Sequence, residues 1–196
     1  PLATYRNGPV SSNVRPHKMR RAMLAVLEYL LGFVALAFFA YIAFGRAPTT
    51  EQSLVIAFQA SSVLAIIEMA FLLAHKSIAN RLIVGANIWL IAGGLAAYLQ
   101  QWWWLRIYQQ LGEASLFLAM LVVGLLTTLG SVSGFVGKLG PASSVRQASL
   151  ILLAAVGCAL VAAMYFRGNI KYAAVLPVIA LSWLNRFLRH RLPSGA

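Results

Sequence analysis

The sequence has no aspartate, only four glutamates and a single cysteine among its 196 residues. With one cysteine the chain can form neither a disulfide framework nor a cysteine-based metal site. Cys158 lies within an apolar run, where we expect it to be a small buried hydrophobe. The histidines, His17, His75 and His190, all lie outside the apolar runs, and no metal-ligand spacing occurs. We therefore expect no cofactor and no metal.

Motifs for nucleotide binding or catalysis are also missing. No P-loop or dinucleotide fingerprint occurs. The stretch Gly130-Ser-Val-Ser-Gly134 places serines between glycines, but a serine nucleophile needs a neighbouring base, and no apolar run contains a histidine. We therefore do not expect an enzyme.

Charge is scarce and apolar residues dominate. Charged residues make up 10% of the chain and hydrophobic residues 61%, whereas soluble domains carry about 25% charged residues. The run Met23–Phe44 has 22 residues and one ionisable group, Glu28. As a helix it is about 33 Å long, enough to cross a hydrocarbon core of about 30 Å. The sequence therefore predicts a membrane protein.

Further apolar runs follow, separated by short polar turns. We predict an all-α bundle of six transmembrane helices, with Thr50 to Ser53 capping the second span and Pro177 kinking the sixth. Around the transmembrane domain, 23–188, lie a basic tail, 1–22, and a short tail, 189–196. Since Met19 is itself a plausible start, residues 1–18 are left out of the reasoning about the fold. The expected spans are Met23–Phe44, Leu54–Ala74, Leu82–Leu99, Ser115–Val136, Ala148–Phe166 and Tyr172–Leu188.

The net charge of +12 lies mostly in alternate loops. Twelve of the 16 Lys and Arg residues lie in the two tails, at the end of span 6 or in the loops after spans 2 and 4, and four lie on the opposite side. The positive-inside rule then places both termini in the cytoplasm, in what we expect to be a bacterial inner membrane. The basic rim would contact anionic headgroups, so the charge requires no nucleic-acid partner.

Two acids, Glu28 and Glu68, lie inside predicted spans at matching depth from the cytoplasmic side. Small neighbours on the same helix faces indicate that both carboxylates face protein. Asn87, Asn185 and Arg186 fall at the same depth, together with Ser131, Ser133, Ser149 and Ser182. This polar layer is a candidate proton, cation or substrate site. The structural alternative is that each glutamate reaches the interface or pairs with a basic residue: Arg20, Arg21, Lys76, Arg81 or Arg186.

Two further patterns concern packing and the membrane interface. Gly130, Gly134 and Gly137 form a GxxxG-like pattern that predicts tight helix packing, with a homo-oligomer face as the alternative. Trp102, Trp103, Trp104 and Tyr108 predict an outer interfacial aromatic belt, with a ligand-stacking platform as the alternative.

These patterns favour a small transporter or channel for an ion or small solute, with the glutamate layer as its gate or coupling site. The alternative is a non-catalytic accessory subunit of a larger membrane complex. An intramembrane lipid enzyme is the third and weakest interpretation, because the chain lacks aspartate and intramembrane histidine.

Overall fold

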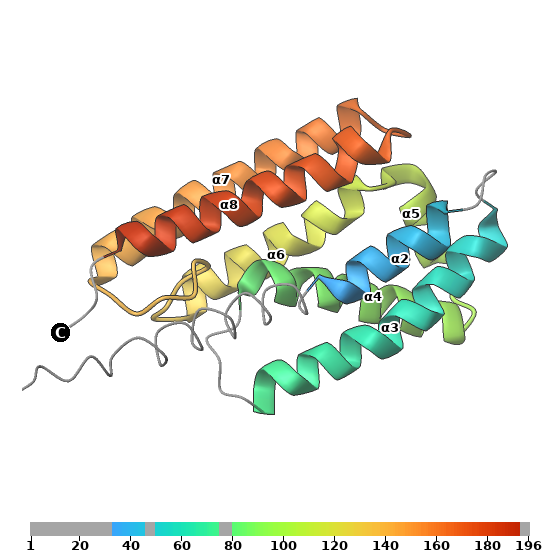
Figure 1. Cartoon of the computed structure of the whole chain (residues 1–196), viewed down its shortest axis with the longest axis horizontal. Helices are drawn as coiled ribbons and strands as arrows, with labels where there is room; N and C mark the ends of the chain where they lie inside the picture. Colours follow the sequence, from blue (N-terminus) through green and yellow to red (C-terminus); the bar gives the residue numbers. More distant parts are fainter. Residues whose placement is uncertain (1–32, 46–49, 75–79, 193–196) are drawn as a thin grey trace, which may run out of the picture.

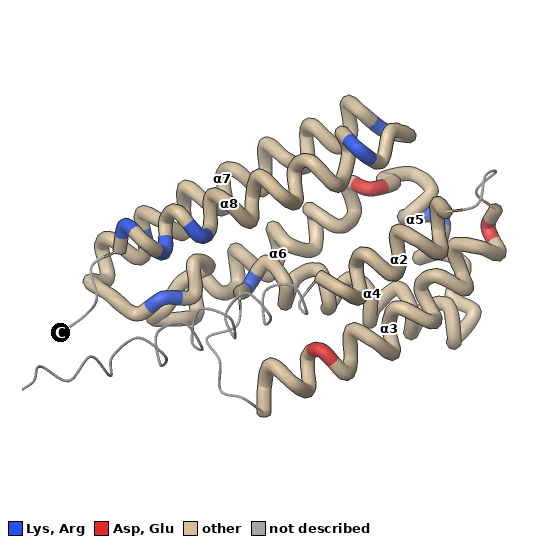
Figure 2. Tube along the Cα trace, in the orientation of Figure 1, with Lys and Arg blue, Asp and Glu red and all other residues tan. Residues whose placement is uncertain are grey.

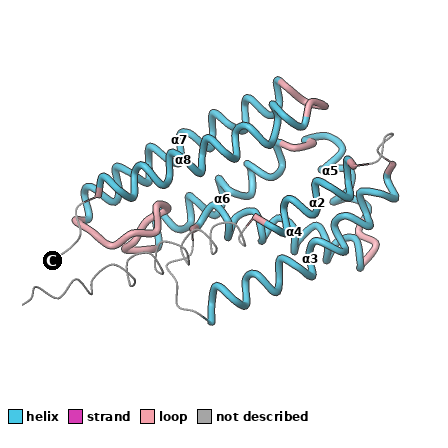
Figure 3. Tube along the Cα trace, in the orientation of Figure 1, coloured by secondary structure: helices cyan, strands magenta, loops and turns pink. Residues whose placement is uncertain are grey.

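A computed structural model describes residues 33–45, 50–74 and 80–192, and its regular secondary structure there is helical throughout (Figures 1 and 3). Met23 to Gly32, including Glu28, and the N-terminal tail lie outside the described residues. The helices are α2 (Val34–Phe44), α3 (Glu51–Ala74), α4 (Arg81–Tyr98), α5 (Trp102–Leu111), α6 (Ala114–Gly130), α7 (Ala142–Tyr165), the π-helical segment η1 (Lys171–Val175) and α8 (Leu176–Arg191).

The membrane assignment is supported by helix length and composition. Among the described helices, α3, α4 and α7 are each long and apolar enough to cross a bilayer. Helices α5 and α6, bent by 101° at their junction, count as a fourth candidate if they form one broken span. Exposed isoleucines and leucines on α3 and α7 suit contact with lipid rather than water. The chain is therefore an all-helical protein with three to four candidate membrane spans.

The start of α3 agrees with the sequence. Thr50 and Ser53 form a reciprocal capping pair, in which each backbone N–H donates to the other residue's hydroxyl at 3.1 Å. This arrangement satisfies two N–H groups that the helix itself leaves free. The predicted cap is confirmed, and α3 begins three residues before the expected span.

The expected fourth span is too long. Helix α6 ends at Gly130, and the following turn places Gly134 and Gly137 at φ values of 54° and 67°. A left-handed backbone cannot continue an α-helix, and glycine tolerates it best. Gly130, Gly134 and Gly137 therefore do not share one helical face, and the prediction that they form a helix-packing surface is wrong. Instead the turn folds inward and buries Phe135 and Val136.

Close helix packing occurs elsewhere, between α3 and α4. A Cβ added at Gly94 would lie 2.2 Å from Ser62 Cβ, and one at Gly93 would lie 2.3 Å from the Phe58 ring. Only hydrogen in place of a side chain allows this approach. Helices α2 and α4 both pack on α3, α6 packs on α4 and α7, and η1–α8 pairs with α7 (Figure 1).

Two other expectations need correction or refinement. Cys158 is exposed on α7 rather than buried. Ahead of Pro177 the chain forms the π-helical turn η1, which ends with the Leu176 N–H donating to Lys171 O. Proline has no N–H and its ring crowds the carbonyl four residues back, so a widened turn accommodates it.

Candidate functional site

Glu68 is buried, with 9% of its surface exposed, and it joins three helices. Its Oε1 accepts the backbone N–H of Ala35 in α2 at 2.9 Å, and its Oε2 accepts Asn87 Nδ2 of α4 at 3.2 Å. Ala35 and Asn87 are both fully buried. The expectation that this carboxylate faces protein is therefore confirmed.

The Ala35 contact follows from where α2 begins. Phe33, with φ −112° and ψ 1°, is not helical, so α2 starts at Val34 and Ala35 lies in its first turn. First-turn N–H groups have no intrahelical acceptor, and the N-terminal end of a helix carries partial positive charge. The Glu68 carboxylate on the neighbouring helix accepts the free N–H and places negative charge beside the partly positive helix end.

Cations do not neutralise Glu68 among the residues that the structure describes. Arg81, one of the expected partners, donates instead to Ser131 Oγ at 2.9 Å and Ser133 Oγ at 2.7 Å. Arg186, another, is exposed on α8 and has no hydrogen bond to the described part of the chain. Both hydrogen-bond donors to Glu68 are thus neutral groups.

Two buried polar atoms in the α3–α4 layer lack partners in the described structure. They are Asn87 Oδ1 and Ser61 Oγ, on residues that are both fully buried. An unpaired buried acceptor is costly, so each is a place where a proton or another donor would be stabilised. Asn87 offers a second acceptor beside the Glu68 carboxylate.

The predicted polar layer divides into two groups. Asn87 lies with Glu68, whereas Asn185 Nδ2 donates to Asn80 Oδ1 at 2.8 Å. The same Asn80 oxygen caps α4 by accepting the Leu82 N–H at 3.2 Å. Asn185 therefore holds α8 against the start of α4, in a cluster that includes the Arg81–serine bonds, and it does not contact the carboxylate.

Lys and Arg gather toward the two ends of the α7–α8 hairpin (Figure 2). At one end Lys138 Nζ donates to Arg189 O at 2.7 Å and Leu192 O at 2.6 Å, which ties the loop after α6 to the end of α8. Partial burial lowers the pKa of the Arg189 guanidinium, although an arginine stays protonated at neutral pH. This end has a structural role that the sequence did not reveal.

The aromatic stretch is only partly interfacial. Trp102 and Trp103 are about half exposed on α5, as an aromatic belt requires, and Trp104 packs partly against the core. Tyr108, however, is only 7% exposed, so placing it in the outer belt was wrong. Its ring lies 5.4 Å from Phe58 and 6.0 Å from Trp89 between centroids.

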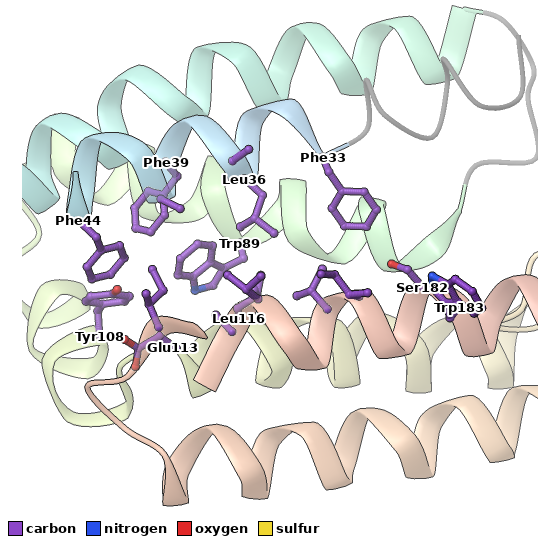
Figure 4. Close-up of a pocket in the computed structure, with 17 residues that line it drawn as sticks. Phe33, Leu36, Phe39, Phe44, Trp89, Tyr108, Glu113, Leu116, Ser182 and Trp183 are labelled. Carbon is purple, nitrogen blue, oxygen red and sulfur yellow. The ribbon is translucent and has the colours of Figure 1, made fainter. Parts of the chain in front are cut away.

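Sequence reasoning missed a cavity of about 410 Å³ between α2 and η1–α8 (Figure 4). Most of its described lining is aliphatic or aromatic, and Glu113 is the carboxylic acid among these residues. The signal in the sequence was weak, because the lining residues come from five separate segments. The comparisons add no assignment: no protein-family model, curated protein or solved structure matches this chain.

Proposed function

We propose that the chain is a small integral membrane transporter or channel for an ion or small solute, with Glu68 and Asn87 as its coupling site. The observation that carries this proposal is the buried Glu68 carboxylate, whose hydrogen-bond donors among the described residues, Ala35 N–H and Asn87 Nδ2, are both neutral. An ionised acid is costly in such surroundings, so a bound proton or cation lowers that cost. Acids in this situation are typical of ion and proton pathways.

Glu68 and Asn87 can form a hydrogen bond with each other whether Glu68 is ionised or protonated. With Glu68 ionised, Asn87 donates through Nδ2 and leaves its Oδ1 unpaired. With Glu68 protonated, the carboxyl O–H would donate to Oδ1 after the amide turns over. Since the other carboxylate oxygen accepts from α2, this exchange couples a proton to the position of that helix.

The proposal includes the full topology: six spans, both termini in the cytoplasm, and a bacterial inner membrane. In this topology α2 is the outer half of span 1, and η1 with α8 forms span 6. The alternating distribution of Lys and Arg supports it.

Flux measurements test the proposal directly. Purified protein in phosphatidylcholine vesicles loaded with a pH dye is given a proton, Na⁺ or K⁺ gradient. We expect flux above that of protein-free vesicles, reduced at least about tenfold by Glu68→Gln, because an amide cannot take up or release a proton. Glu51→Gln, at an exposed acid, is the matched control and leaves flux unchanged.

Two results would contradict transport. One is wild-type flux no greater than that of empty vesicles in all three gradients. The other is full flux from a folded Glu68→Gln variant. Either result, combined with co-purification of other polypeptides at a fixed ratio, would favour the accessory-subunit interpretation.

A further inference from the structure

The cavity between α2 and η1–α8 has the size of a ligand site. Its volume of about 410 Å³ lies within the range of about 300–1,000 Å³ that is typical of small-molecule pockets. Ile179 and Trp183 line the cavity and are also exposed, at 54% and 77%, so the cavity opens on the lateral surface of the helix bundle. In a membrane protein that side faces lipid, so a ligand dissolved in the bilayer could enter.

One end of the cavity is aromatic. Phe39, Phe44, Trp89 and Tyr108 border it there, and Trp89 lies 5.1 Å from Phe39 between ring centroids (Figure 4). The Trp89 indole is fixed by donating to Ser115 Oγ at 3.1 Å. Aromatic side chains attract organic cations through their π faces, and quaternary ammonium groups are the usual ligands of such clusters.

The same end is acidic. Glu113, at the start of α6, borders the cavity beside Tyr108 (Figure 4), and the described lining residues include no Lys, Arg or His. Arg167 lies next to Gly112 but donates to the backbone carbonyl of Gln109. In the described part of the chain, no salt bridge neutralises Glu113. A ligand that complements this lining carries positive charge at one end and apolar groups elsewhere.

We propose that this cavity binds an amphipathic organic cation, an ammonium or phosphonium ion with apolar substituents. If the chain is the transporter proposed above, this cation would be its substrate, and that part of the inference rests on the proposed function. Binding itself does not, because it is measured without flux. A neutral lipid chain would contact the apolar lining but would not need Glu113. The experiment below therefore distinguishes an organic cation from a lipid chain.

The probe is tritiated tetraphenylphosphonium, bound at equilibrium to the full chain in phosphatidylcholine nanodiscs. Binding of tetraphenylborate, an anion of nearly the same shape, is measured in separate samples under the same conditions. We expect saturable binding of the phosphonium and no saturable binding of the borate. Glu113→Gln should weaken binding at least about tenfold, since the charge partner is lost. Glu51→Gln, an acid outside the cavity, should change it by less than about twofold.

A second pair of variants tests location by volume rather than charge. Ala174 lines the cavity, so Ala174→Phe places a ring inside it and should abolish saturable binding. Ala180→Phe puts the same ring on the exposed outer surface of α8 and should leave binding intact. Gel filtration and circular dichroism establish that each variant is folded.

Absence of saturable binding overturns the site, as does equal binding of phosphonium and borate, which would indicate a purely apolar pocket. Full binding by folded Glu113→Gln and Ala174→Phe variants also overturns it. If phosphonium binds but the vesicles show no Glu68-dependent flux, the site stands and the transport function fails. If Glu68-dependent proton flux occurs without phosphonium binding, the transport function stands and the site fails.

Discussion

The carboxylate of Glu68 in α3 accepts the backbone N–H of Ala35 in α2 across 2.9 Å, so a side chain of one helix caps the beginning of another. Capping contacts usually lie within one segment, from a residue just before the helix. Here the two residues are 33 positions apart, and the acceptor that caps α2 is an ionisable group.

Removing this cap should destabilise the protein. Glu68→Ala leaves the Ala35 N–H and the Asn87 amide buried without their acceptor, at a cost of about 1–3 kcal/mol. Glu68→Gln retains a carbonyl for Ala35 and an amide that can face Asn87 Oδ1, so it should cost less than about 1 kcal/mol. Reversible unfolding by dodecyl sulfate in mixed micelles measures both. Equal stability of the alanine and glutamine variants would exclude a capping role.

Asn87→Asp should make stability depend more steeply on pH than it does in the wild type. It replaces the amide donor, 3.2 Å from Glu68 Oε2, with a second carboxyl group. Two adjacent carboxylates cannot both ionise at low cost, so the pair holds a shared proton that is lost as pH rises. Stability should therefore be greatest in acid and fall by about 3 kcal/mol toward alkaline pH. Asn87→Leu, which adds no acid, is the control, and parallel pH profiles for the two variants would contradict the prediction.

The glycines of α4 should matter more than those of the GxxxG pattern. In Gly94→Ala the new Cβ meets Ser62 Cβ and lies 2.9 Å from the Phe58 backbone oxygen, so the helices must separate at a cost of about 1–3 kcal/mol. At Gly130 such a Cβ would have no described neighbour within 4 Å, and Gly130→Ala should change stability by at most about 1 kcal/mol. Thermal unfolding in detergent measures the stability of the Gly94→Ala and Gly130→Ala variants. The reverse order would mean that α3 and α4 pack differently from the structure described.

Arg81 should hold the turn after α6. Arg81→Met removes the hydrogen bonds to Ser131 and Ser133, and we expect amide hydrogens across 131–141 to exchange at least about fivefold faster. Arg186→Met removes an exposed arginine without described hydrogen bonds and should leave exchange in that turn unchanged. Hydrogen–deuterium exchange with mass spectrometry gives both values. Equal protection in the two variants would show that the arginine does not order the turn.

Cysteine labelling tests the topology. In a Cys158→Ser background, Ser143→Cys and Ser194→Cys should react with an impermeant maleimide only from the cytoplasmic side, and Asn169→Cys only from the outside. The single native cysteine makes this background simple to prepare. If Ser194→Cys is labelled from the same side as Asn169→Cys, the prediction of a sixth span is wrong.

The helical class and the ends of several helices could be predicted because they depend on local composition. The run Leu54–Ala74 and the Thr50–Ser53 cap identified α3, and α4 begins one residue before the expected Leu82. The end of α6 was missed because residues 131–136 are as apolar as a span. The helix ends where Ser131 becomes extended, with φ −128° and ψ 133°, and Gly134 and Gly137 then adopt positive φ. Hydropathy carries no information about these backbone angles.

The site was predicted less completely, since it depends on helix rotation and on contacts between distant residues. Depth along the spans singled out Glu68 and Asn87, which the structure brings together. Depth alone also grouped Asn185 and Arg186 with them, although one binds Asn80 and the other is exposed. Tyr108 was assigned to the interface with the tryptophans. Its neighbours Phe58 and Trp89, to which it turns inward, come from other helices.

The π-helical turn at Lys171–Val175 sets the register of everything after it. A π-turn accommodates one extra residue, and each residue of an α-helix turns the chain by about 100°. If η1 relaxed to an ordinary α-helical turn with the same residues, every later residue would advance by about 100°, and Ser182 and Asn185 would move to exposed positions. The length of this short segment therefore matters more than its sequence: most substitutions should be tolerated and a single deletion would leave an ordinary α-turn, whereas a single insertion would turn the inner face of α8 outward.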